Sequence, residues 1–199
     1  MSFNIIYGTP ILKVKMPNHE EILENFLPFI EDENNFDFST SWDCNCGTTI
    51  NNLEKNEIFP WHLFFENIGP ILDEYSSKIG LSNEAKIKMS GHAWANTYTK
   101  DQFQEVHQHQ NKNILISCAY MLKLPKDSAE FSFYHSNYNV FPAHLNYYFD
   151  EHSPFSGSTI KPPLDEGDII FFPSSTSHYV SSHNSTELRA SISANFNIN

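Results

Sequence analysis

The stretch that decides the fold is Gly167-Asp168-Ile169-Ile170-Phe171-Phe172-Pro173, and Ser177-His178-Tyr179-Val180 follows it closely. A short apolar run bounded by glycine and proline is typical of a buried β-strand. The pattern therefore predicts a strand, a turn at the proline, and a second strand that carries His178. A third strand is expected from Leu188 to Phe196, so the last part of the chain is expected to be a series of strands.

Toward the N-terminus, short strand-like runs separated by turn residues continue back to Ile87. The most apolar of them, Asn113–Leu124, is suited to a central strand that is buried on both faces. Roughly seven or eight short strands in series predict a sandwich or barrel of the jelly-roll type. The upstream strands are expected at 87–98, 103–109, 113–124 and 130–134.

Before residue 86 the pattern changes from strands to helices. Apolar residues at helical spacing predict one helix from His19 to about Ile30 and another from Pro60 to about Ile79. Because proline lacks an amide proton, we expect the first helix to kink or break near Pro28 and the second to divide at Gly69-Pro70. The remaining segments are expected to form two short strands within 3–14 and a loop with a short strand at most over 36–58.

The length of 199 residues fits a single domain spanning 1–199. We expect a helical part, residues 1–85, that packs on a mainly β core over 86–199. The aromatic, proline-containing segment 136–163 is long for a connection, and such loops often act as lids over a site.

Composition excludes several kinds of partner. The formal net charge of −12 argues against binding to duplex nucleic acid or to an anionic membrane surface. The three cysteines form no disulfide framework, and no signal peptide or membrane span is recognisable. We therefore expect a cytoplasmic protein. A C-x-C zinc half-site at Cys44 and Cys46 is a weak alternative, and a homodimer is an open possibility.

Three histidines are candidate metal ligands. His107 and His109 are two residues apart, so on a strand they would project from the same face. His178, on a later strand, is the best candidate for a third ligand, and imidazole suits zinc, copper, iron and nickel. The chain contains ten histidines, so a chance H-x-H is the competing interpretation. Glu105, on the same face by alternation, is a further candidate if His109 does not bind.

Arg189 is the sole arginine of the chain, and every other basic residue is lysine or histidine. A guanidinium presents a planar fork of donors that matches a carboxylate, which an ammonium group does not. Its position eleven residues after His178 favours a role as a carboxylate anchor beside the metal. A structural ion pair is the alternative.

Taken in order, these motifs resemble the 2-oxoglutarate- and Fe(II)-dependent oxygenase superfamily. They are most similar to its small members from phages and marine bacteria, which carry W-x-N, H-x-H, a strand like S-G-x-Y-Y-L, G-x-L-x-x-F-P, a histidine and R-x-S-x-S-x-N. The matching positions cover about half the chain. They are Trp94 and Asn96, His107 and His109, Ser117 through Leu122, Gly167 through Pro173, His178, and Arg189, Ser191, Ser193 and Asn195.

The resemblance implies a double-stranded β-helix, or cupin-like jelly roll, that uses Fe(II) and 2-oxoglutarate to hydroxylate a substrate. It implies that His107, His109 and His178 bind the iron, although most members have a carboxylate where His109 stands. 2-Oxoglutarate would chelate the iron, and its far carboxylate would pair with the arginine of the R-x-S motif. The residues expected to bind this cofactor are Arg189, Ser191, Tyr98, Tyr120 and Asn96.

Two other functions remain open on the sequence. One is a cupin-like three-histidine metal protein that does not use 2-oxoglutarate, and the other is a non-catalytic binding module of the same fold. The sole arginine favours the oxygenase, because a plain cupin site has no need of it. The sequence does not decide whether the substrate is a small molecule or a protein side chain.

Overall fold

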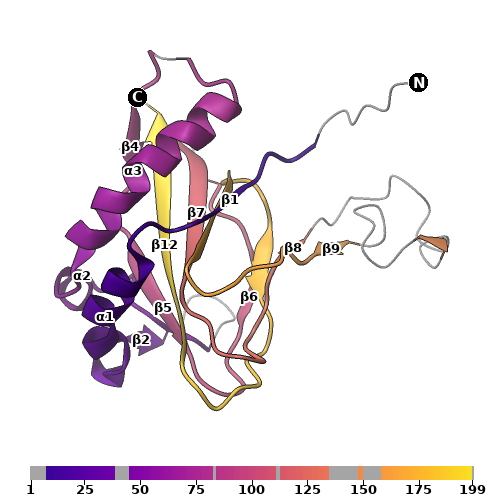
Figure 1. The fold of residues 1–199 in the computed structure, drawn as a ribbon. Helices are drawn as coiled ribbons and strands as arrows, with labels where there is room; N and C mark the ends of the chain where they lie inside the picture. The colour runs from indigo at the N-terminus through magenta and orange to yellow at the C-terminus, as the bar shows by residue number, and fades with distance from the viewer. Residues whose placement is uncertain are drawn as a thin grey trace.

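The computed structural model describes residues 8–38, 45–82, 84–110, 113–134, 148–149 and 158–198. The predicted strand within 3–7 and most of the predicted lid, 136–147 and 150–157, lie outside these residues. Two antiparallel sheets and a layer of helices make up the described structure (Figure 1). This arrangement confirms the predicted mainly β jelly-roll core with N-terminal helices.

The larger sheet has eight strands in the order β1-β10-β7-β12-β5-β3-β2, with β4 paired to β12. The smaller sheet has four strands in the order β6-β11-β8-β9. The strands are β1 (Leu12–Lys15), β2 (Asp37–Phe38), β3 (Gly47–Thr48), β4 (Ile87–Met89), β5 (Trp94–Tyr98), β6 (Gln104–His107), β7 (Ile114–Lys123), β8 (Phe131–Tyr134), β9 (Thr159–Ile160), β10 (Asp168–Pro173), β11 (His178–Val180) and β12 (Arg189–Ile198).

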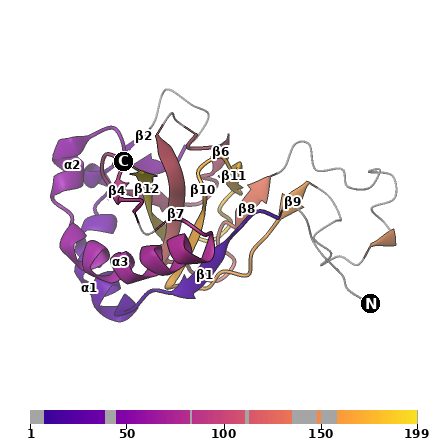
Figure 2. The same ribbon diagram turned by 90° about the horizontal axis from the view of Figure 1, so that it is seen from above.

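Helices α1 (His19–Ile30) and α3 (Trp61–Lys78) cover the outer face of the larger sheet (Figure 2). Their apolar faces pack on every second residue of the central strands, and this layer is the main core. The buried members of this layer include Ile22, Phe26, Phe64, Ile68, Cys118, Tyr120 and Ile192. Among the described residues no helix is long and apolar enough to span a membrane.

Both long helices continue through their prolines, so the first does not break at Pro28 and the predicted division of the second at Gly69-Pro70 was wrong. Each proline is exposed, and water can therefore hydrate the carbonyl group that lacks its amide partner. The loop prediction for 36–58 missed α2 (Leu53–Glu57), whose first turn is capped by Asn52 accepting from the Lys55 amide. Short polar helices of this kind carry little hydrophobic periodicity.

A second core lies between the two sheets. The inward faces of β7 and β10 meet those of β8 and β11 there, through Met121, Phe172, Phe131 and Val180. These four apolar side chains also line the cavity that contains the polar residues described below.

Gly167 fixes the start of β10 and its contact with α1. Its φ is +84°, and a Cβ atom there would lie 2.9 Å from the His19 ring. We expect Gly167→Ala to lower the free energy of unfolding by more than about 1 kcal/mol, because both the backbone and the contact become strained. Urea denaturation measures this change.

The matched control is Gly69→Ala, where an added methyl group meets nothing within 4 Å. We expect that variant to change the stability far less. Equal losses in the two variants would contradict the account of Gly167.

Candidate metal centre

Three histidines, two from neighbouring strands and one from the loop that follows the first strand, converge inside the jelly roll. His107 ends β6 and lies directly opposite His178, the first residue of β11. The ring centroids are 4.3 Å apart for His107 and His178, 4.9 Å for His109 and His178, and 5.2 Å for His107 and His109. Candidate ligand atoms of the three all lie within 4.8 Å of one another. One ion about 2.1 Å from each nitrogen could bind here.

His109 reaches this cluster from a loop, whereas the sequence predicted it on the same strand as His107. β6 ends at His107, and the His109 amide then donates to the Ser174 carbonyl at 2.9 Å. That bond holds the loop against the connection between β10 and β11. The third histidine is therefore placed by a tertiary contact and not by the alternation of a strand.

A β-bulge changes which side chains of β6 face inward. The register pairs His178 with His107 and Val180 with Gln104, so three steps on β6 match two on β11. Gln104 and His107 consequently both line the cavity, although they are three positions apart and would face opposite sides of a regular strand. Glu105 does not line it, and the described groups that could hold a metal do not include it. Strand alternation had wrongly favoured Glu105 as the alternative ligand.

The hydrogen bonds of the three rings leave one nitrogen of each directed at the cluster. Nδ1 of His107 lies 2.8 Å from the Glu105 carbonyl, and Nδ1 of His178 lies 2.9 Å from the Thr176 carbonyl. Nδ1 of His109 lies 2.8 Å from Oδ1 of Asn195. All three partners are acceptors, so each Nδ1 carries the proton and each Nε2 keeps its lone pair. A metal-binding histidine needs this tautomer.

Burial keeps the three rings neutral. It lowers the pKa of His109 to about 4, with a further decrease from the neighbouring His107. Burial also lowers the pKa of His107, and it lowers that of His178 well below the ordinary value, where the other two histidines add to the effect. At neutral pH the cluster therefore presents three uncharged donors.

Arg189 lies in the same cavity and is fully buried. Its guanidinium stacks on the Tyr98 ring at 4.5 Å, and Nη2 donates to the Met121 sulfur at 3.6 Å. Nε and Nη1 have no hydrogen-bond partner in the part of the chain that the structure describes. Burial lowers the pKa of Arg189, but a guanidinium stays charged at neutral pH. A buried cation with two unused donors is costly, which indicates a site for an anion.

The pairing of β5 with β12 brings the other predicted cofactor residues to this cavity. Arg189 lies opposite Tyr98, and Ser191 lies opposite Asn96. All four line the cavity together with the three histidines. Oδ1 of Asn96 is buried and has no partner among the described residues, so it too is available to a ligand. The structure thus brings together seven of the eight residues predicted for the site.

Tyr120 is the exception, because it does not line the cavity. It projects from the opposite face of β7 into the helical layer, where its hydroxyl lies 2.6 Å from Nδ1 of His19. Its neighbours Ala119 and Met121 face the cavity instead. The geometry does not support a role for Tyr120 in binding the cofactor.

The sequence also left some residues of the cavity without a role. Gln104 accepts a hydrogen bond from the Tyr98 hydroxyl at 3.0 Å, and the bulge that turns it inward has no clear sequence signal. Trp94 packs beside His109, with ring centroids 5.6 Å apart. Met121 contacts the arginine. The alternation of side chains along β7 could have indicated this contact, but only after one inward-facing residue of that strand had been identified.

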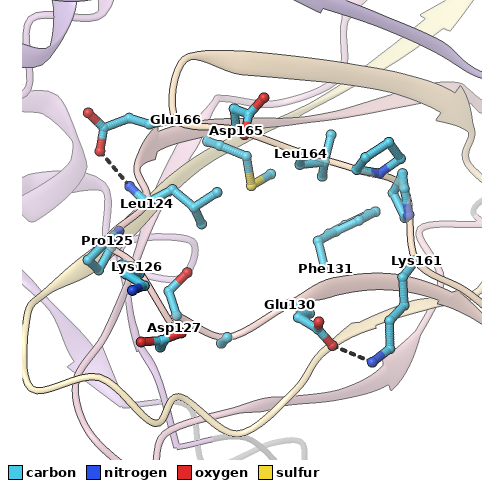
Figure 3. Close-up of a pocket in the computed structure, with 15 residues that line it drawn as sticks. Leu124, Pro125, Lys126, Asp127, Glu130, Phe131, Lys161, Leu164, Asp165 and Glu166 are labelled. Atoms are coloured by element: carbon cyan, nitrogen blue, oxygen red, sulfur yellow. Dashed lines mark hydrogen bonds and ion pairs between the residues drawn. The ribbon is translucent and has the colours of Figure 1, made fainter.

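An open pocket of about 520 Å³ lies on the other side of Met121 and Phe131, which line both spaces. Figure 3 shows its rim, where Glu130 pairs with Lys161 and a Glu166 carboxylate oxygen accepts from the Leu124 amide. The two shared side chains are apolar and buried. They form a wall between this pocket and the cavity that contains the arginine.

Comparison with known proteins agrees with this geometry. A family model described as "Putative 2OG-Fe(II) oxygenase" matches residues 92–195, more than half of the chain. The chain belongs to the 2OG-Fe(II) oxygenase family. The chain is therefore an enzyme of this family, and its cofactors are Fe(II) and 2-oxoglutarate. No curated protein matched the chain in a sequence search.

Solved structures share the fold at low sequence identity. A prolyl-4-hydroxylase from Pseudomonas putida has a TM-score of 0.61 at 10% identity, covering 95% of this chain and 92% of that one. HygX from Streptomyces hygroscopicus, with nickel, 2-oxoglutarate and hygromycin B bound, has a TM-score of 0.58 at 10% identity, covering 95% and 83%. The viral collagen prolyl hydroxylase of Paramecium Bursaria Chlorella virus-1 has 0.55 at 11% identity, covering 96% of each chain. These identities support the fold alone.

The lowered pKa values predict how many protons a metal displaces. At pH 6.5, three ordinary histidines would be about half protonated and would release roughly 1.5 protons on binding a metal. Here burial lowers all three pKa values, so the rings carry fewer protons at this pH and we expect clearly less than about 1.5 protons to be released. Calorimetric titration with Co(II) at pH 6.5, in buffers of different ionisation enthalpy, counts the protons. Release of about 1.5 would contradict the neutral cluster.

Proposed function

We propose that this protein is a 2-oxoglutarate-dependent dioxygenase in which His107, His109 and His178 bind Fe(II). We further propose that Arg189, with Ser191, Tyr98 and Asn96, binds 2-oxoglutarate. The observation that carries the proposal is the fully buried guanidinium with two unpartnered donors, in the same cavity as three converging neutral histidines.

The donor set fits both groups. Imidazole nitrogens suit iron, and three of them leave coordination positions for a chelating ligand and for oxygen. 2-Oxoglutarate has a keto acid at one end, which can chelate a metal, and a second carboxylate at the other end. That second carboxylate matches the fork of Nε and Nη donors of Arg189. Its negative charge would compensate the buried guanidinium, for which no ion pair is present among the described residues.

When bound, Fe(II) and 2-oxoglutarate supply the oxidation of the substrate by dioxygen, with succinate and carbon dioxide as co-products. The chain's own residues position these groups and exclude water. Tyr98 supports the guanidinium from one face, and Met121 with Phe131 separates it from the outer pocket. The Nδ1 hydrogen bonds hold each imidazole with Nε2 facing the shared centre. The expected reaction is hydroxylation of a small molecule or a protein side chain.

The competing function, a three-histidine metal protein without 2-oxoglutarate, includes no ligand for Arg189 to bind. A buried guanidinium would then reduce stability without a compensating ligand. The two functions differ in what happens when the arginine is replaced.

We expect Arg189→Ala to bind Co(II) normally but to lose affinity for 2-oxoglutarate by about 2–5 kcal/mol, or roughly 30-fold or more. Arg189→Lys should recover only part of this loss, because an ammonium group cannot form the two parallel bonds. Calorimetric titration of 2-oxoglutarate into the Co(II)-loaded protein measures both effects.

Lys123→Ala is the matched control, since it removes a nearby positive charge that pairs with Glu31 outside the cavity. Unchanged 2-oxoglutarate affinity in Arg189→Ala would contradict the proposal. In a separate experiment, succinate release by the unaltered protein in the presence of candidate substrates identifies the substrate class.

A further inference from the structure

The three histidines differ in what orients them. His107 and His178 each bond through Nδ1 to the carbonyl of the residue two positions earlier. These partners belong to the backbone, so any residue at that position would supply them. His109 depends on side chains from two other strands, Asn195 of β12 and Ser117 of β7. The orientation of His109 is therefore specified by side chains outside its own segment.

The partners of His109 are themselves fixed by the sheet. Asn195 and Ser117 lie directly opposite each other in the β12–β7 register. The Ser117 hydroxyl donates to Oδ1 of Asn195 at 2.7 Å, and the same oxygen lies 2.8 Å from Nδ1 of His109. Oγ of Ser117 also lies 3.2 Å from that nitrogen. The amide oxygen of Asn195 can only accept, so it requires the proton to be on Nδ1, and Oγ of Ser117 can also accept from Nδ1 because its own proton is donated to Asn195.

We propose that Asn195, held by Ser117, is the positioning residue that makes His109 a neutral third metal ligand. This inference rests on the proposed metal site. A histidine in a loop can rotate and can carry its proton on either nitrogen, and a proton on Nε2 blocks metal binding. Asn195 prevents both by accepting from Nδ1. It therefore decides whether the centre has three histidines or two.

The opposite orientation of the Asn195 amide has a different consequence. If Nδ2 faced His109, the amide would donate to Nδ1 and the ring proton would move to Nε2, away from the geometry needed for a metal. Aspartate has only acceptor oxygens at this position. Asn195→Asp therefore separates the two orientations, because it preserves an acceptor and eliminates the donor.

The test measures Co(II) affinity by calorimetry in the absence of 2-oxoglutarate. We expect Asn195→Leu to weaken Co(II) binding by about 10- to 100-fold, the usual effect of losing a partner behind a metal ligand. Asn195→Asp should retain at least the original affinity, and Ser117→Ala should lose less than Asn195→Leu. Thermal unfolding of each metal-free variant verifies that it is folded.

Asn197→Leu is the matched control. It is the same substitution two residues along the same strand, and Oδ1 of Asn197, unlike that of Asn195, has no hydrogen-bond partner among the described residues. We expect it to leave Co(II) affinity unchanged.

Three results would overturn the inference. Unchanged affinity in Asn195→Leu would show that the asparagine does not position His109. A loss in Asn195→Asp as large as that in Asn195→Leu would show that the amide acts as a donor. If the unaltered protein did not bind Co(II) at all, this result would contradict both the proposed metal site and this role of Asn195.

Discussion

The site depends on the pairing of β12 with a strand on each side. Arg189–Ile198 is hydrogen-bonded to β5 along one edge and to β7 along the other. This double pairing fixes both the register and the facing of the strand, so every second residue is directed inward. The register sets Arg189 against Tyr98, Ser191 against Asn96, and Asn195 against Ser117. The arginine at one end and the partner of a histidine at the other are thus held by one rigid element.

Burial of charge is the second constraint on this interior. The described cavity contains a guanidinium that no carboxylate of the described chain neutralises, and three imidazoles that burial keeps uncharged. A centre with neutral ligands leaves the charge of a divalent metal uncompensated, whereas a histidine pair with a carboxylate would cancel part of it. A dianionic ligand held in this cavity would compensate two of the three positive charges that a divalent metal and the guanidinium carry.

Much of this site was predictable because alternation along a strand is reliable where the strand is regular. It correctly placed Arg189 and Ser191 on one face, and the glycine–strand–proline pattern correctly located His178 on the next strand. Alternation failed on β6, where a bulge turns Gln104 inward and leaves Glu105 outside the cavity. It could not orient β7 either, because that strand is apolar on both faces and its sequence does not show which face meets the helices. Tyr120 was assigned to the wrong face for that reason.

The most direct test of the central claim is the anaerobic addition of Fe(II) and 2-oxoglutarate to the metal-free protein, followed by absorption spectroscopy. Chelation of Fe(II) by the keto acid within the histidine cluster should produce a metal-to-ligand charge-transfer band in the visible region. The band should be absent when either component is omitted and absent in His178→Ala, while His62→Ala, at an exposed histidine of α3, should retain it. A folded, Fe(II)-loaded protein that shows no such band with 2-oxoglutarate would contradict the account.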